Sequence, residues 1–325
     1  MKAVVASRPG GPDVIELREV ETPSPGTGEI AIDVVGAGVN GADLLQRRGH
    51  YPPPPGASEI IGLEVSGRVG ELGAEVAGWA VGDPCVALLA GGGYAERVVV
   101  PAGQVLPPPP GLDLLAAAGV IEVAATVVSN LGRAQLRRGE VFLVHGGAGG
   151  IGSFAIQYAK ALGATVITTA GSADKLAYCR VLGADHAISY RDDWPAAVRA
   201  AAERGVDVVL DNMGAKYLDQ HLDLLARNGR LVIIGFQGGT TTTLNLGRLL
   251  AKGTSIAAAS LRARPVSEKA AICAQVAAEV WPLLGDGTIR PTEHLVYPLA
   301  EAAEAHARLE SGDNTGKIIL QVGSL

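Results

Sequence analysis

The sequence predicts an α/β fold that combines a doubly wound parallel sheet with a β-barrel-like domain. Two observations indicate the parallel sheet. A strand, a glycine loop and a helix follow one another from Val141 to Ala164, and short apolar strands alternate with apolar-periodic helices from about Gly119 onward. The third observation indicates the barrel-like domain, because the first hundred or so residues are dense in glycine and proline and contain short β-rich runs.

The predicted domain boundaries follow from the order of these patterns. β-rich runs occur at 30–35, 64–69, 84–88 and 97–100. The segment VLPPPPGLD (105–113) is expected to be a connector, because proline fixes its own φ and lacks an amide donor. The tail holds the strand-like pieces LVYPL and KIILQV around a helix that starts near Ala300. We therefore expect residues 1–118 and 288–325 to form the first domain, and residues 119–287 the second.

The glycine loop predicts a Rossmann-type dinucleotide site. Three of its glycines have G-x-G-x-x-G spacing. Gly147 permits the tight turn, Gly149 lets the backbone approach a pyrophosphate, and Gly152 lets the helix pack close to the strand. The amides of the helix N-terminus then face the anion. The predicted cofactor-binding loop is made of Gly147, Ala148, Gly149, Gly150, Ile151 and Gly152.

The next predicted strand indicates which dinucleotide binds. Ala170 and Gly171 stand where an acidic residue would bind the ribose 2′-hydroxyl of NADH, so no carboxylate repels a 2′-phosphate. Ser172 and Lys175 offer that phosphate a hydroxyl and a cation, which favours NADPH. The alternative is that Ser172 caps the following helix and Lys175 is a solvated charge. Asp174 complicates the preference, since it lies close enough to pair with Lys175 or to cap the helix itself.

Composition excludes several classes of partner. The 325 residues are 48% hydrophobic and carry a formal net charge of -6, so there is no basic footprint for nucleic acid or an anionic membrane surface. We expect a cytoplasmic protein, because there is no signal peptide and Glu122 interrupts the best apolar run. The three cysteines lack metal-ligand or disulfide spacing and are expected to be small core residues.

Motifs along nearly the whole chain resemble the zinc-independent quinone oxidoreductases of the medium-chain dehydrogenase/reductase superfamily, the branch that includes zeta-crystallin and the p53-inducible quinone reductase homologues. The resemblance implies a GroES-like substrate domain, a Rossmann-type cofactor domain, an active-site cleft between them and a homodimer. The motifs that carry it are GVNGADLLQRRGHYPPPP (38–55), GLEVSGRV (62–69), GGYAERVVVP (92–101), VHGGAGGIGSFAIQYAKALGA (144–164), GADHAISYR (183–191), LRAR (261–264) and TGKIIL (315–320).

The sequence departs from the metal-using relatives at their zinc ligands. Asn40 stands where those relatives place a cysteine, and Gly62, Leu63 and Glu64 stand where they have glycine, histidine and glutamate. The four-cysteine structural lobe is also missing, so we expect no metal. Without a Lewis acid, hydride transfer from the reduced nicotinamide to a quinone or an activated alkene suits the site better than alcohol oxidation.

The resemblance also assigns candidate catalytic residues. Asn40, Asp43, Arg47 and Tyr51 match the polar positions of the quinone reductase motif. Asn40 is expected to hydrogen-bond a carbonyl that gains charge, and Tyr51 to stack on a planar ring or donate a proton. Structural interpretations stay open for each of them. Asn40 could satisfy a turn, Asp43 and Arg47 have the i,i+4 spacing of a helical ion pair, and Tyr51 could be a packing anchor.

Further residues are carried over from the relatives. Thr126 is expected near the nicotinamide, with a helix-core role as the alternative, and Tyr190 at the adenosine end of NADPH, with a buried strand position as the alternative. His145 has no visible catalytic partner and is interpreted as structural. The remaining cofactor-binding candidates are Gly235, Phe236, Leu261 and Asn314.

Three functions are compatible with these features. The leading hypothesis is an NADPH-dependent quinone oxidoreductase that transfers hydride or single electrons without a metal. The alternative is an NADPH-dependent reductase of 2-alkenals, enones or enoyl thioesters, with Tyr51 as proton donor. A third hypothesis is a non-catalytic nucleotide- or RNA-binding protein, which the acidic balance of charge disfavours.

Overall fold

The structure is a computed structural model that describes residues 1–323. The chain forms two compact units. The first unit contains residues 1–125, 261–287 and 291 onward, and the second contains residues 126–260 and 288–290. Each unit has its own sheet and its own apolar core, and each is described by itself below.

The first unit is built on a seven-stranded sheet around the long strand β3 (Glu29–Val39). β3 pairs antiparallel with three strands, because β6 contacts its residues 29–33, β15 contacts its residues 36–39, and β4 pairs along most of its length. The β3–β4 ladder has register shifts at Ala31/Ile32 and Val34/Gly36. The order is β14-β15-β3-β4-β5-β7, with β6 also on β3, and a separate hairpin is formed by β1 and β2. The strands are β1 (Lys2–Ala6), β2 (Ile15–Glu19), β4 (Glu64–Leu72), β5 (Pro84–Leu88), β6 (Arg97–Pro101), β7 (Val105–Leu106), β14 (His294–Pro298) and β15 (Lys317–Gln321).

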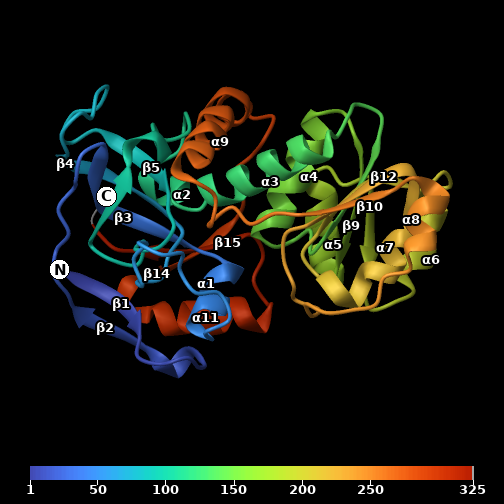
Figure 1. Cartoon of the computed structure of the whole chain (residues 1–325), viewed down its shortest axis with the longest axis horizontal. Coiled ribbons are helices and arrows are strands. Elements are labelled where there is room, and N and C mark those ends of the chain that lie inside the picture. The colour runs from blue at the N-terminus through green and yellow to red at the C-terminus, as the bar shows by residue number, and fades with distance from the viewer. Residues whose placement is uncertain (324–325) are drawn as a thin grey trace. The chain divides into compact units, whose positions relative to one another are not determined.

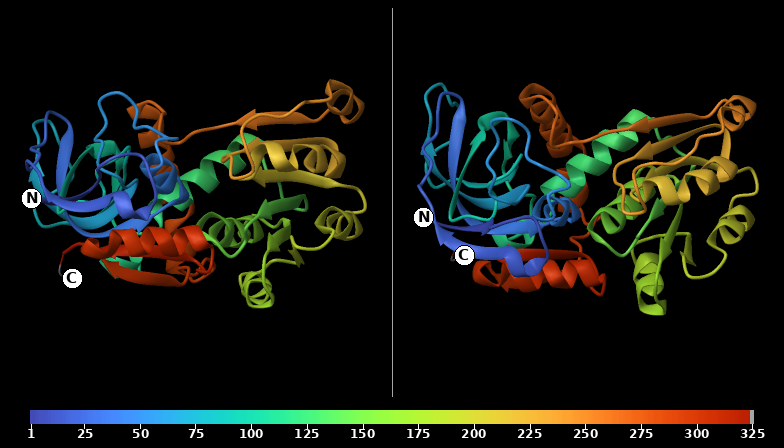
Figure 2. Two further views of the ribbon diagram at one scale, coloured as in Figure 1. Left: turned by 90° about the horizontal axis from the view of Figure 1, so that it is seen from below. Right: turned by 60° about the horizontal axis from the view of Figure 1, so that its bottom comes forward.

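Helices and short 3₁₀ turns cover this sheet. Figures 1 and 2 show α11 (Ala302–Ser311, red) beside the short α1 (Gly41–Arg47), and the two helices are in contact. α9 (Val266–Glu279) packs on η2 (Ala102–Gln104). The unit also contains α2 (Leu114–Ala117), the start of α3 (Ile121–Ala134), α10 (Trp281–Gly285), η1 (Pro12–Val14) and η4 (Leu299–Glu301).

The second unit is a six-stranded, fully parallel sheet in the order β10-β9-β8-β11-β12-β13. Numbered from β8, this is the order 3-2-1-4-5-6 of a dinucleotide-binding fold, whose strand order reverses between β8 and β11. Figure 2 shows β13 as the outermost strand beside β12. The strands are β8 (Val141–His145), β9 (Thr165–Ala170), β10 (His186–Ser189), β11 (Val206–Asp211), β12 (Leu225–Ile233) and β13 (Ser255–Ala258).

Three helices of the second unit begin at polar caps, and one ends at a glycine. The side chains of Ser172, Asp193 and Asn245 accept backbone hydrogen bonds at three helix starts, and Gly253 ends α8 in the left-handed conformation at φ 63°. Besides α3, the helices are α4 (Gly150–Ala161), α5 (Ala173–Val181), α6 (Trp194–Ala201), α7 (Leu218–Leu224) and α8 (Leu246–Lys252), with η3 (Gly214–Tyr217).

Most predicted elements are present, and the units differ from the predicted domains at 119–125, 261–287 and 288–290. The β-rich runs and the returning tail correspond to observed elements, and residues 107–113 of the proline connector belong to no helix or strand. Residues 261–287 were predicted to belong to the second domain, whereas they lie in the first unit, because α9 packs on η2 and the Trp281 indole donates to the carbonyl of Pro107 at 2.8 Å. The three cysteines are all buried and unpaired, as predicted.

One helical stretch passes a length and composition test for a membrane span. It runs from Leu114 to Ala134, and 78% of its most apolar window is buried within the structure. The sequence prediction was that Glu122 interrupts this run. A mostly buried apolar helix is a common feature of protein cores.

Candidate cofactor and acceptor sites

The glycine loop lies at the carboxyl end of β8 and leads directly into α4. Gly146 makes the turn at φ 68°, and the amide of Gly147 donates to the carbonyl of Thr169 at 3.0 Å. A side chain at Gly147 would collide with Thr168, and one at Gly152 would collide with the backbone of Gly146. These two glycines are therefore required for the close packing of loop, helix and sheet, which was predicted for Gly152, whereas the tight turn predicted for Gly147 is made by Gly146.

The remaining glycine of the motif faces open space. A Cβ on Gly149 would meet only the carbonyl oxygen of Gly146, at 3.5 Å. Gly149 is also the N-cap of α4, so the first amides of this helix point toward the same side without helical partners. Across the loop, Asn212 follows β11 at the point where the strand order reverses, and its Oδ1 is buried without a hydrogen-bond partner. An open cradle of amides beside an unpaired polar atom fits a dinucleotide phosphate and its nicotinamide.

The predicted phosphate-recognition residues follow β9 and β10. The Ser172 side chain accepts from the amide of Lys175 at 3.4 Å, so the capping interpretation of Ser172 is confirmed. Gly171 packs against the hydroxyl of Tyr190, whose side chain is 45% exposed. Tyr190 is therefore not an ordinary buried strand residue. Asp174 lies in the first turn of α5 and is exposed.

His145 lies beneath the loop in a buried polar network. Its Nε2 lies 2.8 Å from Nε2 of His221 on α7, and its Nδ1 lies 2.9 Å from the hydroxyl of Thr169. Burial lowers the pKa of His145 to about 3, so the ring is neutral. The rings of Trp194 and Tyr217 pack around it. These contacts agree with the structural interpretation of His145.

Thr126, Gly235 and Phe236 are the other residues of the second unit that were predicted to lie near the cofactor. Thr126 is buried on α3, and its carbonyl accepts from the Asn130 amide at 2.7 Å. Gly235 and Phe236 follow the end of β12, where a Cβ on Gly235 would crowd the backbone of Asn212 at 3.1 Å. The Phe236 side chain is half-exposed. Gly235 and Asn212 therefore border the same end of the sheet as the glycine loop.

In the first unit, Asn40 belongs to a buried polar cluster that the sequence did not predict. The Lys317 ammonium lies 2.7 Å from Oδ1 of Asn40 and 2.6 Å from a carboxylate oxygen of Glu64. The Asn40 amide donates to Glu64 at 3.0 Å and to the carbonyl of Gly38 at 3.3 Å. The second Glu64 oxygen accepts from the amide of Glu122 at 2.9 Å. Both Asn40 N–H bonds are thus engaged, so donation to an acceptor carbonyl would require one of these bonds to break.

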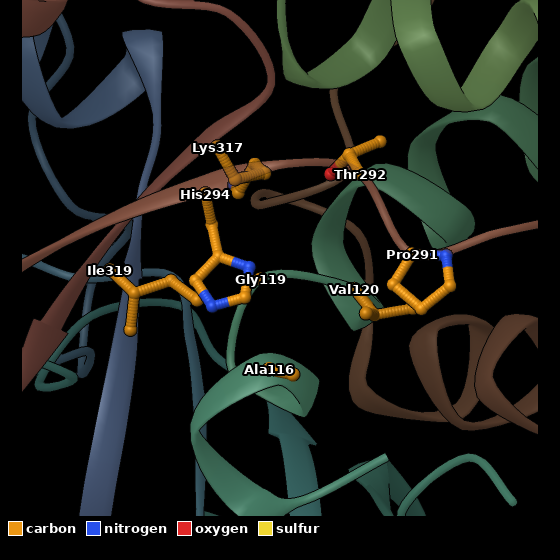
Figure 3. Close-up of a pocket in the computed structure, with 8 residues that line it drawn as sticks. All are labelled: Ala116, Gly119, Val120, Pro291, Thr292, His294, Lys317 and Ile319. Carbon is orange, nitrogen blue, oxygen red and sulfur yellow. The ribbon is translucent and has the colours of Figure 1, made fainter. Parts of the chain in front are cut away.

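Lys317 also borders a small cavity of about 10 Å³, which has room for about one water molecule. Figure 3 shows residues of β14, β15 and the segment around α2 lining it. The lining residues are Ala116, Gly119, Val120, Pro291, Thr292, His294, Lys317 and Ile319.

The polar cluster does not fit a zinc ion. The Lys317 ammonium already occupies the position between Asn40 and Glu64, and a second cation there would be repelled. Across residues 1–323, no group of three or more histidine, cysteine or acidic side chains is arranged to hold a metal. Asn40 and Glu64 therefore have a lysine, rather than a metal, as their common cation.

Asp43 and Arg47 do not pair with each other, so the predicted i,i+4 ion pair is wrong. Asp43 caps the start of α1 by accepting from the amide of Asn40 at 2.7 Å, and it accepts from the Tyr94 hydroxyl at 3.0 Å. Arg47 instead contacts Glu310 at 3.0 Å and Nδ1 of His306 at 3.3 Å. Nε2 of His306 lies 3.2 Å from the Tyr94 hydroxyl, which closes a buried network.

Burial determines the charge of this network. Burial raises the pKa of Asp43 to about 7, against the opposing effect of its two hydrogen bonds and of the Lys317 charge. Burial lowers the pKa of His306 to about 3. A neutral His306 accepts from Arg47 at Nδ1 and donates to Tyr94 from Nε2, and Tyr94 donates to Asp43. Asp43 and Arg47 are therefore structural partners of α1 and α11.

Tyr51 lies against Arg262, a second residue that the sequence did not predict. The guanidinium carbon lies 5.3 Å from the centroid of the Tyr51 ring, and Nη1 donates to the Tyr51 carbonyl at 3.0 Å. Leu261 directly precedes Arg262 and is partly buried. Asn314 is buried, and its amide makes a local bond to the carbonyl of Gly316 at 3.4 Å.

Some of the site residues that were not predicted from the sequence carried a signal in it, and others did not. Asn212 ends the predicted strand VDVVLDNMG, so its place at the carboxyl edge of the sheet was available from the pattern. Arg262 and Lys317 lie within the quoted motifs LRAR and TGKIIL, but their partners are far away in the chain. Tyr94 likewise lies within the quoted motif GGYAERVVVP, whereas His221 carried no local signal.

Comparison with protein families identifies both units. The family described as alcohol dehydrogenase GroES-like domain matches residues 26–110, and the family described as zinc-binding dehydrogenase matches residues 150–275. The fold and the glycine loop thus define a dehydrogenase or reductase of the medium-chain type.

Relatives narrow this class. The quinone oxidoreductase of Pseudomonas aeruginosa is 35% identical over 96% of both chains, and quinone oxidoreductase 1 of Escherichia coli is 32% identical over 96% of both. A solved structure of Escherichia coli quinone oxidoreductase complexed with NADPH covers 99% of this chain and 100% of its own, with a TM-score of 0.88 and 29% identity. The chain belongs to the quinone oxidoreductase family of the medium-chain dehydrogenase/reductase superfamily.

Proposed function

We propose that this enzyme is an NADPH-dependent quinone oxidoreductase that needs no metal. The observation that carries the proposal is the open cradle at Gly149, at the N-terminus of α4 and beside the unpaired Oδ1 of Asn212. Relatives of full length bear the name quinone oxidoreductase, and a neighbouring structure contains NADPH. These similarities favour this function over the enone reductase and the non-catalytic binding protein.

The chemistry requires positioning more than acid–base catalysis. Bound NADPH would supply a hydride, which carries two electrons and one proton, and a proton from solvent completes the reduction of a quinone to a hydroquinone. In the first unit, Tyr51 offers a planar ring for the acceptor to stack on. The Lys317 ammonium, whose charge Glu64 balances, would hold the Asn40 side chain in place by its contact with Oδ1. In the second unit, Gly235 and Asn212 would border the nicotinamide, and the α4 amides would bind the pyrophosphate.

The preference for NADPH rests on the residues after β9 and β10. Ala170 and Gly171 present no carboxylate to the 2′-phosphate, whereas Lys175 offers a cation and Tyr190 a partly exposed ring. Replacing Ala170 by aspartate should reverse this, because the carboxylate would repel the phosphate and accept from the 2′-hydroxyl of NADH.

The proposal also covers the substrate class and the oligomeric state of the enzyme. The partner is a small-molecule quinone, and we propose that the enzyme is a homodimer, because the edge strand β13 and the exposed apolar side chains of α8 offer a surface to a second copy. A cytoplasmic location stays a prediction from the sequence.

Steady-state oxidation of NADPH tests the function. Purified enzyme should oxidise NADPH with benzoquinone and naphthoquinone, and far more slowly with a crotonyl thioester or a 2-alkenal. The Ala170→Asp variant should lose preference for NADPH over NADH by at least about tenfold, a change of about 1.4 kcal/mol in binding. Strong thioester turnover that Tyr51→Phe abolishes, together with negligible quinone turnover, would replace the proposal by the enone reductase.

A further inference from the structure

Arg262 is a buried cation without a carboxylate at salt-bridge distance in the described chain, and the Asp43 carboxyl acts on its charge only at longer range. Only 4% of the residue is exposed. Within residues 1–323, no carboxylate oxygen lies within 4.0 Å of a guanidinium nitrogen, the limit for a salt bridge. A buried charge that lacks a counter-ion is costly, and a lysine or arginine in that state is rare unless another interaction compensates for it. Arg262 is therefore an unusual feature of the first unit, and the proposed reduction assigns no role to it.

The guanidinium connects three segments of the first unit. Nε donates to the carbonyl of Ala90 at 2.7 Å, Nη1 to the carbonyl of Tyr51 at 3.0 Å, and Nη2 to Oε1 of Gln46 at 2.8 Å. These bonds join the turn after β5, the proline-rich loop after α1, and α1 itself. They use three of the five N–H bonds of a rigid planar fork, a geometry that lysine cannot reproduce.

The same group fixes the face of one aromatic ring. The distance of 5.3 Å between the guanidinium carbon and the Tyr51 ring centroid is within the range of a cation–π contact. Tyr51 precedes four prolines, whose restricted φ angles limit the conformations of the loop on that side. Arg262 therefore holds both the backbone and the ring of the residue that we propose meets the acceptor.

We propose that Arg262 is a positioning residue that determines acceptor specificity, by orienting Tyr51 and by placing behind its ring a positive charge that is in no salt bridge. The acceptor class that this arrangement fits is a planar quinone on which negative charge is present, such as an ionised hydroxyquinone, or develops during reduction. The inference rests on the proposed function, because it takes Tyr51 as the residue at the acceptor.

Ligand binding without turnover provides the first test. The probe is the anion of 2-hydroxy-1,4-naphthoquinone, compared with neutral 1,4-naphthoquinone, each titrated calorimetrically into the full-length enzyme with NADP⁺. Arg262→Met should weaken binding of the anion by about tenfold and that of the neutral quinone by less than about threefold. Arg262→Lys keeps the charge but not the planar fork, so its affinity for the anion should lie between those of the wild type and Arg262→Met. Equal weakening of both ligands would overturn the specificity role and leave a purely structural one.

A matched control is two residues away. Arg264 is partly exposed and lies 3.6 Å from Glu268 in an i,i+4 pair, so Arg264→Met removes the same charge without touching Tyr51. This control should bind both ligands like the wild type. A loss of anion binding in Arg264→Met equal to that in Arg262→Met would show a general effect of charge and overturn the inference.

A double-mutant cycle tests whether Arg262 acts through the ring. Arg262→Met should lower kcat for naphthoquinone by about tenfold without changing KM for NADPH, and by less than about twofold in the Tyr51→Leu background. The same loss in both backgrounds would overturn the positioning role. Because the calorimetric test needs no catalysis, failure of quinone turnover would reject the proposed function while the role of Arg262 could still be decided.

Discussion

At the residue scale, Lys317 is the cation of the buried polar cluster that contains Asn40 and Glu64. Its ammonium is buried between Glu64 and Asn40, and Glu64 has no other cation within salt-bridge distance in the described chain. A buried pair of this kind contributes little net stability relative to an apolar replacement, but removal of one partner leaves the other charge stranded. Removing one charge of this pair should therefore destabilise the protein, whereas removing both should destabilise it much less.

This asymmetry predicts the stability of Lys317 variants. Lys317→Met should lower the free energy of unfolding by about 3–5 kcal/mol, because the Glu64 carboxylate stays buried without a cation. The double variant Lys317→Met, Glu64→Gln should recover much of the loss. Urea denaturation of the three proteins measures these values. Lys160→Met, which removes a half-exposed pair with Asp185, is the control and should cost less than about 1 kcal/mol. A loss below that value in Lys317→Met would contradict the argument.

The buried carboxyl of Asp43 should make the stability of the protein depend on pH. Burial raises its pKa from the ordinary value of 3.8 to about 7, so between these pH values the folded protein binds a proton that the unfolded chain releases. The stabilisation from this proton is present below pH 4 and is lost as the pH rises toward 7, at up to about 1.4 kcal/mol per pH unit. His145 and His306 act in the opposite direction, since their lowered pKa values make the folded state less stable as the pH falls below about 6.5.

Comparison with Asp43→Asn isolates the contribution of Asp43 from that of the histidines. The difference in unfolding free energy between wild type and variant should shrink or change sign as the pH rises from 4 to 8, because the asparagine does not ionise. Denaturation at several pH values measures it. A difference that is constant across this range would show that Asp43 does not titrate there.

At the element scale, the patterns that predicted correctly are local ones. The strand, loop and helix at 141–161 and the parallel order that follows depend on apolar periodicity and glycine spacing, which a sequence displays directly. The packing of α9 on the first unit depends on η2, about 160 residues earlier by sequence number, and no local pattern encodes it. The contacts of Lys317 with Asn40 and of Arg262 with Tyr51 were hidden for the same reason.

Substitutions in the glycine loop should have two different effects, a loss of stability at Gly147 and a loss of NADPH affinity at Gly149. Gly147→Ala should destabilise the fold by about 1–3 kcal/mol, because the new methyl group collides with the Thr168 side chain. Gly149→Ala should leave the melting temperature within a few degrees of the wild type, yet weaken NADPH binding by at least about tenfold, because its methyl group enters the cradle. Thermal unfolding and fluorescence titration with NADPH distinguish them. Unchanged NADPH affinity in Gly149→Ala would place the pyrophosphate elsewhere.

At the scale of the whole molecule, the second unit carries the surface on which the proposed homodimer rests. β13 is an edge strand, and the helix before it presents Leu246 at 68% and Leu250 at 86% exposure. These leucines line an open hollow together with Gly253 and Thr254 at the start of β13. An unprotected strand edge beside exposed apolar side chains promotes pairing with another chain, and a symmetric dimer buries the same surface twice.

Replacing these leucines should therefore separate the subunits. Light scattering after size exclusion should give twice the mass of the 33.1 kDa chain for the wild type, and the mass of one chain for the Leu246→Asp, Leu250→Asp variant at low micromolar concentration. Val181→Asp is the matched control, because Val181 on α5 is 76% exposed and lies away from β13 in sequence and in sheet order. The control should stay dimeric. Retained NADPH binding would show that the variant is folded, since the glycine loop lies on β8, two strands from β12 and three from the edge. A wild-type monomer, or an aspartate variant that remains dimeric, would move the interface to another surface.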